Sequence, residues 1–253
     1  MVKPSTSEPS PLSPKRWPAD AFAWPRSLVA LLIVLAAFAL GIAAASLLIV
    51  ILARAAHTVP TKTTTLTWGI ALGQYISYLP ILAALIVVLP RLARRSLRDL
   101  GWTPPTGAVI RAGVVGAIAM YAVTIGVAGI QFAITHAKPE ETAIQLFGST
   151  KDPALLASFV VLAAFAAPLM EEFEFRGFLF NAFLRYLPVW AAALASGILF
   201  GLSHASPTAF FPLAASGVVL AYVYYKSGSL TASAITHALF NLINVALLSL
   251  GKT

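Results

Sequence analysis

The chain has 253 residues, of which 59% are hydrophobic and only 10% are charged, and its mean hydropathy is +0.85. Soluble domains carry about 25% charged residues, so this composition excludes a water-soluble globular protein. The formal net charge is +8, but the basic residues lie in short segments beside apolar runs, as membrane-orientation signals do. A nucleic-acid-binding protein is therefore excluded as well. The absence of cysteine excludes disulfides, iron–sulfur clusters and thiol nucleophiles.

Residues 1–26 contain six prolines among serines and threonines, a composition that predicts a disordered cytoplasmic tail. Residues 27–250 are predicted to form one all-α transmembrane domain, because a helix pairs its own backbone polar groups where no water is available. About 20 helical residues cross the ~30 Å hydrocarbon core of a membrane. The first apolar runs of this kind are residues 27–53, 67–89 and 107–134.

Five further apolar runs follow Pro153, separated by short connections, at residues 154–170, 173–187, 189–204, 210–225 and 229–250. The sequence therefore predicts a polytopic bundle of about eight helices, with residues 154–250 as the part that carries the polar motifs. The run 173–187 is short and contains Arg176 and Arg185. A tilted helix, a re-entrant segment and a continuation of the preceding helix are all compatible with it.

The distribution of lysine and arginine predicts the orientation of the bundle. Basic residues are concentrated in the tail and in the connection 91–98, so both segments are expected to be cytoplasmic. With eight crossings, the fourth helix would end at Glu171 and the sixth at His204, both on the cytoplasmic side, and His237 would lie near the middle of the membrane. The polar residues would then converge in the cytoplasmic half of the bilayer.

The segment Glu171-Glu172-Phe173-Glu174-Phe175-Arg176 carries four charges within an apolar region. A charged residue at the centre of a membrane helix costs about 2.5 to 3.5 kcal/mol, so each needs a partner or a function. Glu172 and Arg176 are four residues apart and share a helix face, which predicts an ion pair. Glu171 is rotated from Glu172 by about 100° and has no basic residue at helical spacing, which makes it a candidate general base. Glu174 is either interfacial or a second acid.

Two histidines lie in apolar segments downstream of the glutamates, at His204 and His237, and Asn241 follows His237 on the same helix face. A carboxylate, two imidazoles and an amide together supply the groups that hydrolysis of a peptide bond needs. One takes a proton from water, others stabilise the oxyanion, and a divalent cation can polarise the carbonyl. Each residue also has a purely structural interpretation: an ion pair for Glu172, a satisfied core imidazole for each histidine, and an interhelical hydrogen bond for Asn241.

These residues form three motifs, Glu171-Glu172-x-x-x-Arg176, Phe200-x-x-x-His204 and His237-x-x-x-Asn241. With these motifs in this order, the chain resembles the CAAX-processing and bacteriocin-processing (CPBP, or Abi) family of intramembrane proteases, roughly over residues 154–250. The resemblance implies a membrane-embedded cavity open toward the cytoplasm. It also implies that Glu171 activates water and that His204 assists it or binds metal. His237 and Asn241 would stabilise the oxyanion or complete a metal site, and Glu172 and Arg176 would orient the motif.

The expected function is an intramembrane endopeptidase of the cytoplasmic membrane, with its N-terminus in the cytoplasm and the lipid bilayer as its surroundings. The expected substrates are membrane-associated proteins or peptides, with prenylated CAAX-type tails as one candidate class, and not nucleic acid. The expected cofactor is one divalent cation such as zinc, held by Glu171, His204 and His237, or no metal. A non-catalytic immunity or scaffold protein with the same fold is the main alternative. A proton-coupled transporter is disfavoured, because the first three spans offer a single polar cluster at residues 74–78.

Overall fold

The computed structural model describes residues 26–55, 67–88, 90–91, 96–139, 146 and 148–250. All regular structure in these ranges is helical, which confirms the predicted all-α class. The predicted tail, residues 1–26, lies outside the described residues apart from Arg26. The first elements are α1 (Arg26–Ala55), α2 (Trp68–Ala83), the π-helix η1 (Ala84–Val88), the short 3-10 helix η2 (Leu97–Leu100) and α4 (Gly107–Thr135).

A single long helix, Pro153–Leu184, follows these elements. Asp152 caps its start by accepting the backbone N–H groups of Ala154 and Leu155, and Pro153 occupies the first turn, where its missing N–H is not needed. Its successive parts are α6 (Pro153–Val161), the π-helix η3 (Leu162–Ala166), α7 (Ala167–Glu171), the π-helix η4 (Glu172–Phe180) and α8 (Asn181–Leu184). The chain then forms α9 (Val189–Ser203), α10 (Phe210–Ser227) and α11 (Leu230–Leu250).

The apolar runs predicted at residues 154–170 and 173–187 thus belong to one helix. Of the three alternatives for residues 173–187, continuation of the preceding helix is the one that the structure shows. The backbone at Glu171 and Glu172 is right-handed helical, with φ of −66° at both residues, so the charged pair does not interrupt the helix. The described residues therefore contain seven long helical segments rather than the eight that were predicted.

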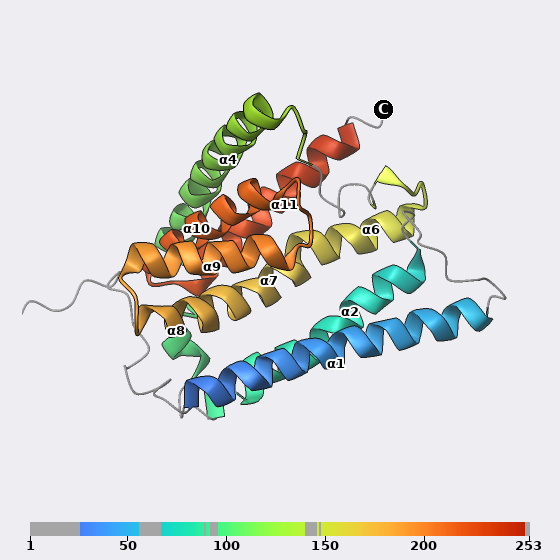
Figure 1. The fold of residues 1–253 in the computed structure, drawn as a ribbon, viewed down its shortest axis with the longest axis horizontal. Helices are drawn as coiled ribbons and strands as arrows, with labels where there is room; N and C mark the ends of the chain where they lie inside the picture. The colour runs from blue at the N-terminus through green and yellow to red at the C-terminus, as the bar shows by residue number, and fades with distance from the viewer. Residues whose placement is uncertain are drawn as a thin grey trace, which may run out of the picture.

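Successive helices run in opposite directions, so the bundle has two distinct ends (Figure 1). The helices α1, α4, α9 and α11 begin at one end, and η1, α8 and α10 finish there. We call this the basic end, because it carries Arg91, Arg98, Arg111, Arg185 and Lys226. Joining the fourth and fifth runs reverses the direction of every later helix. The prediction that His204 shares a side with the end of the fourth helix is therefore wrong, because α9 carries it to the end opposite Arg185.

The interior is closely packed around α9 and α10. A Cβ atom added at Gly217 would lie 2.7 Å from the Cα of Gly197, so the two backbones touch at this crossing and only glycine fits. Small residues at helix crossings are typical of membrane bundles. The fully buried side chains Phe180, Phe200 and Leu220 fill the space between these helices and the long helix 153–184.

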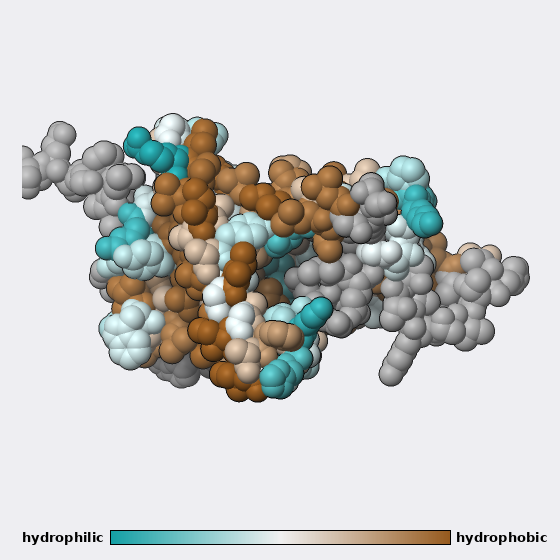
Figure 2. All heavy atoms as spheres, turned by 90° about the horizontal axis from the view of Figure 1, so that it is seen from above, coloured by the Kyte–Doolittle hydropathy of each residue, from teal (hydrophilic) through white to brown (hydrophobic). Residues whose placement is uncertain are grey.

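The outer surface is apolar. Large hydrophobic side chains such as Ile118, Ile125 and Leu40 are exposed on the outside of the bundle, and brown residues cover much of the face in Figure 2. Within the described residues, five helices are long and apolar enough to cross a membrane: α1, α2 with η1, α4, the long helix 153–184, and α11. An exposed surface of this kind is stable in lipid and not in water.

Candidate active site

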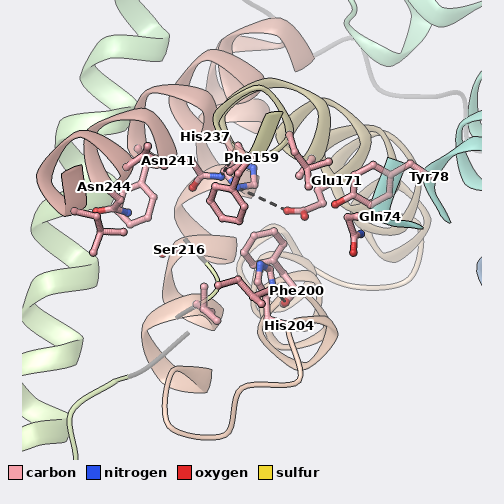
Figure 3. Close-up of a pocket in the computed structure, with 18 of the residues that line it drawn as sticks. Gln74, Tyr78, Phe159, Glu171, Phe200, His204, Ser216, His237, Asn241 and Asn244 are labelled. Carbon is pink, nitrogen blue, oxygen red and sulfur yellow. Dashed lines mark hydrogen bonds and ion pairs between the residues drawn. The ribbon is translucent and has the colours of Figure 1, made fainter. Parts of the chain in front are cut away.

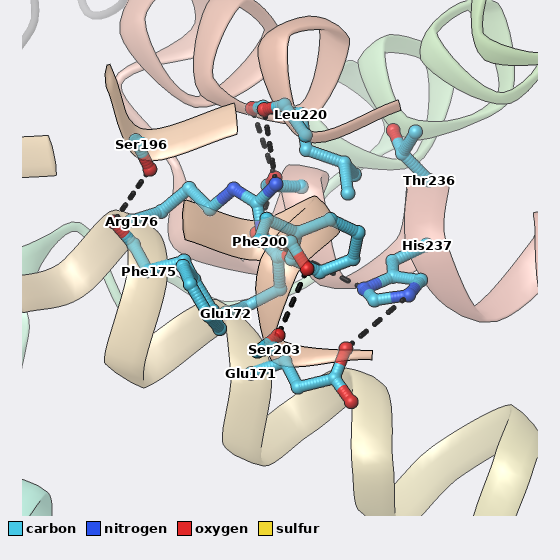
Figure 4. Close-up of polar contacts among 12 residues, drawn as sticks. Glu171, Glu172, Phe175, Arg176, Ser196, Phe200, Ser203, Leu220, Thr236 and His237 are labelled. Carbon is cyan, nitrogen blue, oxygen red and sulfur yellow. Dashed lines mark hydrogen bonds and ion pairs between the residues drawn. The ribbon is translucent and has the colours of Figure 1, made fainter. Parts of the chain in front are cut away.

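A buried ion pair lies at the centre of the bundle. Arg176 Nη1 donates to Glu172 Oε1 at 2.9 Å, and neither side chain is accessible to solvent. Arg176 Nη2 donates to the backbone carbonyl of Gly217 at 3.0 Å, and its guanidinium carbon lies 4.7 Å from the centre of the Phe200 ring (Figure 4). The predicted pair is therefore present. It ties the long helix to α9 and α10.

Glu172 also holds two residues of α11. Ser233 Oγ donates to Glu172 Oε2 at 2.6 Å, and His237 Nδ1 lies 3.1 Å from Glu172 Oε1. Since a carboxylate oxygen accepts, the hydrogen of this imidazole is on Nδ1 and the other ring nitrogen is turned away from Glu172. One buried carboxylate thus selects the tautomer and orientation of His237, as outer carboxylates commonly do for functional histidines.

Glu171 approaches the same imidazole from its other side. Glu171 Oε2 lies 3.7 Å from His237 Nε2, a separation longer than a direct hydrogen bond. The side chain of Glu171 is 16% exposed, whereas that of Glu172 is fully buried, so Glu171 is the carboxylate that a small molecule can reach. The 100° rotation between neighbouring helical residues separates the two acids as predicted. Glu172 contacts Nδ1 of His237, and Glu171 lies on the Nε2 side of the same ring.

Phe200 connects the histidines to the ion pair. Its ring centre lies 4.7 Å from that of His204 and 5.6 Å from that of His237. His204 Nδ1 lies 2.8 Å from the carbonyl oxygen of Phe200, and because a carbonyl only accepts, the hydrogen is on Nδ1. The Nε2 atom of His204 is left as an acceptor. The two residues of the motif Phe200-x-x-x-His204 therefore contact one another at the end of α9. The carbonyl and the ring of Phe200 fix the position of the His204 imidazole.

Asn241 has a structural bond that the sequence motif did not reveal. In η3, the N–H of Ala167 bonds to the carbonyl of Leu162, five residues earlier, and Pro168 has no N–H to continue this pattern at Ala163. Asn241 Nδ2 donates to the carbonyl of Ala163 at 2.8 Å. This bond fastens α11 to the long helix about two turns before Glu171. It matches the structural alternative considered for this residue and leaves the second amide hydrogen free.

We expect Asn241→Ala to lower the stability of the folded protein. The substitution leaves the Ala163 carbonyl without its donor, and an unsatisfied polar group in an apolar setting costs about 1 to 3 kcal/mol. Thermal unfolding of the purified protein in detergent measures this effect. Leu242→Ala is the control, because Leu242 is exposed on the outside of α11. A midpoint for Asn241→Ala that equals the wild-type value would contradict a fastening role.

A pocket of about 340 Å³ brings the four predicted catalytic residues together (Figure 3). Glu171, His204, His237 and Asn241 all line it, whereas Glu172 and Arg176 lie behind its wall. Apolar side chains such as Phe159 form the rest of the lining, a composition typical of small-molecule and peptide sites. In Figure 3, Glu171 and His237 lie on one side of the space and His204 below it.

The predicted metal ligands do not form a cluster. Among the described residues, no three His, Cys, Asp or Glu side chains are grouped so that they could hold a metal ion. Glu171 and His237 lie together, but Nδ1 of His237 is already bonded to Glu172, and His204 lies across the pocket. The present arrangement therefore does not fit the predicted zinc set of Glu171, His204 and His237.

Several site residues were not anticipated. Ser233 was missed, although it lies four residues before His237 and so shares the helix face of His237 and Asn241. Tyr78 and Gln74 of α2 also line the pocket. They border a second cavity of about 370 Å³ between α1, α2 and the long helix, and Glu174 lines this second cavity together with Glu171. Nothing in the sequence indicated that α2 would approach Glu171.

Residues 153–243 match the family described as type II CAAX prenyl endopeptidase, Rce1-like. These residues belong to the CAAX protease family. The family expected from the three motifs is thus confirmed for this region, which contains all of the motif residues. No match was found among curated proteins or among solved structures. The similarity of residues 153–243 to this family and the five apolar helices together indicate a multi-pass membrane protein.

Proposed function

We propose that this chain is an intramembrane endopeptidase that hydrolyses peptide bonds of membrane-associated proteins or peptides with water activated by Glu171. The observation that carries this proposal is the pair Glu171 and His237. Both side chains line the pocket, and Glu172 contacts the other ring nitrogen of His237. Prenylated CAAX-type tails are one substrate class that the family description suggests. The pocket itself selects for an apolar chain rather than for one particular sequence.

The proposed reaction begins with a water molecule between Glu171 and His237, where a separation of 3.7 Å between side chains favours a bridging water. Glu171 takes one proton from the water, and the oxygen bonds to the carbonyl carbon of the scissile peptide. The C–N bond then breaks, and the leaving nitrogen takes the proton from Glu171. One carboxylate thus serves first as general base and then as general acid.

The other residues stabilise this reaction. The free amide hydrogen of Asn241 donates to the oxyanion, and Glu172 holds His237 in place beside the attacking water. His204 assists from across the pocket, where its Nε2 can accept a hydrogen bond. No step uses a metal, because the candidate ligands are not grouped. The predicted divalent cation stays a prediction, which metal analysis of the purified protein and assays with a chelator would test.

The full-length chain reconstituted in lipid discs is expected to cleave membrane-anchored peptides. The products of a peptide panel are identified by mass spectrometry, and the double variant Glu171→Gln, His204→Ala serves as the inactive control. New peptide ends that appear equally with both proteins would contradict the proposal. A double variant that keeps full activity in cells would instead support the immunity or scaffold alternative.

We also propose that the N-terminus is cytoplasmic. Eleven of the 17 basic residues lie in segments joined to the basic end of the bundle. They are Lys3, Lys15, Arg16, Arg26, Arg91, Arg94, Arg95, Arg98, Arg111, Arg185 and Lys226. Segments joined to the opposite end contain five, namely Arg54, Lys62, Lys138, Lys151 and Lys252. An excess of this kind is typical of the cytoplasmic side of membrane proteins, which supports the proposal.

A further inference from the structure

We infer that Asn244 of α11 is a substrate-binding residue, whose amide N–H group donates a hydrogen bond to a main-chain carbonyl of an extended peptide segment. The contact lies about three peptide residues from the bond that is cleaved. This inference rests on the proposed function, since it names the form in which that site takes its substrate. Asn244 and the residue that holds it, Tyr121, both lie outside the residues 153–243 that match the protease family.

Asn244 lies on the same face of α11 as the proposed active-site residues. It follows His237 by seven residues, and at 100° per residue this step returns to within about 20° of the same direction. The side chains of His237, Asn241 and Asn244 all line the pocket (Figure 3). In that view, Asn244 lies beyond Asn241 on the side away from Glu171. One helix face therefore carries a row of polar groups along the wall of a largely apolar pocket.

The phenol of Tyr121 on α4 fixes the orientation of the Asn244 amide. Tyr121 Oη donates to Asn244 Oδ1 at 2.6 Å, and the Tyr121 ring packs against that of Phe240, with 4.7 Å between centres. Because Oδ1 is engaged by Tyr121, the NH₂ group of the same planar amide is turned away from that phenol. Within the described part of the chain, no group is bonded to its Nδ2 atom. Both of its hydrogens are therefore available to a ligand in the pocket.

Another polar residue of the lining, Ser216, is engaged by the protein itself. Its hydroxyl donates to the carbonyl of Pro212 at 3.0 Å and lies 2.7 Å from the hydroxyl of Thr124. Asn244 differs from it, because its donor is left over once its acceptor is bonded. The arrangement thus presents a fixed donor, and the complementary group on a ligand is an acceptor.

A peptide main chain provides that acceptor. A carbonyl that leaves water for an apolar pocket needs a new donor, because a buried acceptor without one is unfavourable. Each peptide residue carries such a carbonyl, so this contact does not depend on the side chains of the substrate. A carbonyl inside a helix is already bonded to the N–H four residues later. The acceptor therefore belongs to a segment that is extended in the pocket.

The helix spacing places this carbonyl relative to the scissile bond. The seven-residue step from His237 to Asn244 corresponds to about 10.5 Å along the helix axis, at 1.5 Å per residue. An extended peptide advances about 3.3 Å per residue. A segment that lies along this face of α11, with its scissile carbonyl beside His237, therefore presents to Asn244 the carbonyl about three residues away.

Peptide binding to the inactive parent Glu171→Gln tests this contact without turnover. Asn244→Leu replaces the amide by an apolar group of similar shape, and Tyr121 keeps the Phe240 carbonyl, 3.3 Å away, as an acceptor. Dissociation constants of the membrane-anchored peptide panel are measured in lipid discs by energy transfer between labels on the chain and on the peptide. We expect an increase of about 3- to 10-fold, the usual effect of losing one neutral hydrogen bond. Leu247→Ala, exposed on the outside of α11, is the control and should bind as the parent does.

A scan of the peptide with single ester bonds separates a lost contact from a change in the fold, because an ester carbonyl is a weaker acceptor than a peptide carbonyl. We expect one ester, about three residues from the scissile bond, to weaken binding to the parent and to have no further effect in Asn244→Leu. In the active chain, Asn244→Leu should raise KM with little change in kcat. Tyr121→Phe should raise KM less, and should add nothing once Asn244 is replaced.

Equal dissociation constants for the parent and Asn244→Leu would overturn the inference. So would an ester scan that the substitution does not change, or a parent that binds no peptide of the panel. A chain that binds peptides through Asn244 but cleaves none would refute the proposed function and keep this contact. Peptide cleavage with a KM that Asn244→Leu leaves unchanged would refute the contact and keep the function.

Discussion

Replacement of Glu171 by glutamine is expected to lower the rate of peptide hydrolysis about 10²- to 10⁴-fold, the usual contribution of a positioned general base. Glutamine has nearly the same shape as glutamate but cannot take a proton from water. Glu171 is also the more exposed of the two adjacent carboxylates, so its replacement does not leave a buried charge unpaired. The rate of product formation by purified protein in lipid discs measures the effect, and the folded yield should not change.

Glu174→Gln is the matched control for this prediction. Glu174 lies three residues further along the same helix and lines the second cavity with Glu171, but it does not line the pocket that contains His237. The control removes one acid from the same region without removing the proposed base. Rates that fall equally in the two variants would show that loss of negative charge, and not loss of the base, is responsible.

Arg176→Ala is expected to destabilise the folded protein by about 3 to 5 kcal/mol, because removing one partner of a buried ion pair leaves the other charge unpaired. Arg176 is fully buried, holds Glu172 at 2.9 Å and bonds to the Gly217 carbonyl on α10. The same change also removes the cation from the face of Phe200, which supports both histidines. Activity should therefore be lost together with stability.

Thermal unfolding in detergent and the yield of monodisperse protein measure this second effect. Arg185→Ala is its control, because Arg185 follows the same helix but is exposed at the basic end. We expect Arg185→Ala to have the unfolding midpoint of the wild type. A normal yield and midpoint for Arg176→Ala would show that Glu172 is satisfied by Ser233 and His237 alone, and would contradict the role assigned to the ion pair.

Much of the fold follows from local patterns in the sequence. The apolar runs predicted at residues 27–53, 107–134 and 229–250 agree with α1, α4 and α11 to within two residues at each end. This agreement has a physical cause, since an apolar run in lipid has to satisfy its backbone within itself and therefore forms a helix wherever it occurs. The pairing of Glu172 with Arg176 is equally local, because residues four apart lie on one face of a helix.

The continuity of the long helix could not be predicted in the same way. Three carboxylates and an arginine in six residues are unfavourable for a membrane helix unless they have partners, and most of those partners come from other segments. Ser233 and His237 lie more than 60 residues away from Glu172, and the carbonyl of Gly217 lies 41 residues from Arg176. Because their presence makes the charged stretch stable as a helix, the number of crossings depends on contacts that no local pattern contains.

The sequence by itself determined that this is an all-helical membrane protein, which polar residues are candidates for its site, and which of two adjacent acids pairs with Arg176. These properties depend on composition and on helical spacing, which a short stretch of chain contains. The tertiary structure decided that Asn241 donates to the Ala163 carbonyl, which Pro168 leaves without a helical donor, that Glu172 orients His237, and that the pocket is lined by the helix halves away from the basic end. Each of these depends on which helices become neighbours and in which direction they run, and that is settled only when the whole bundle packs.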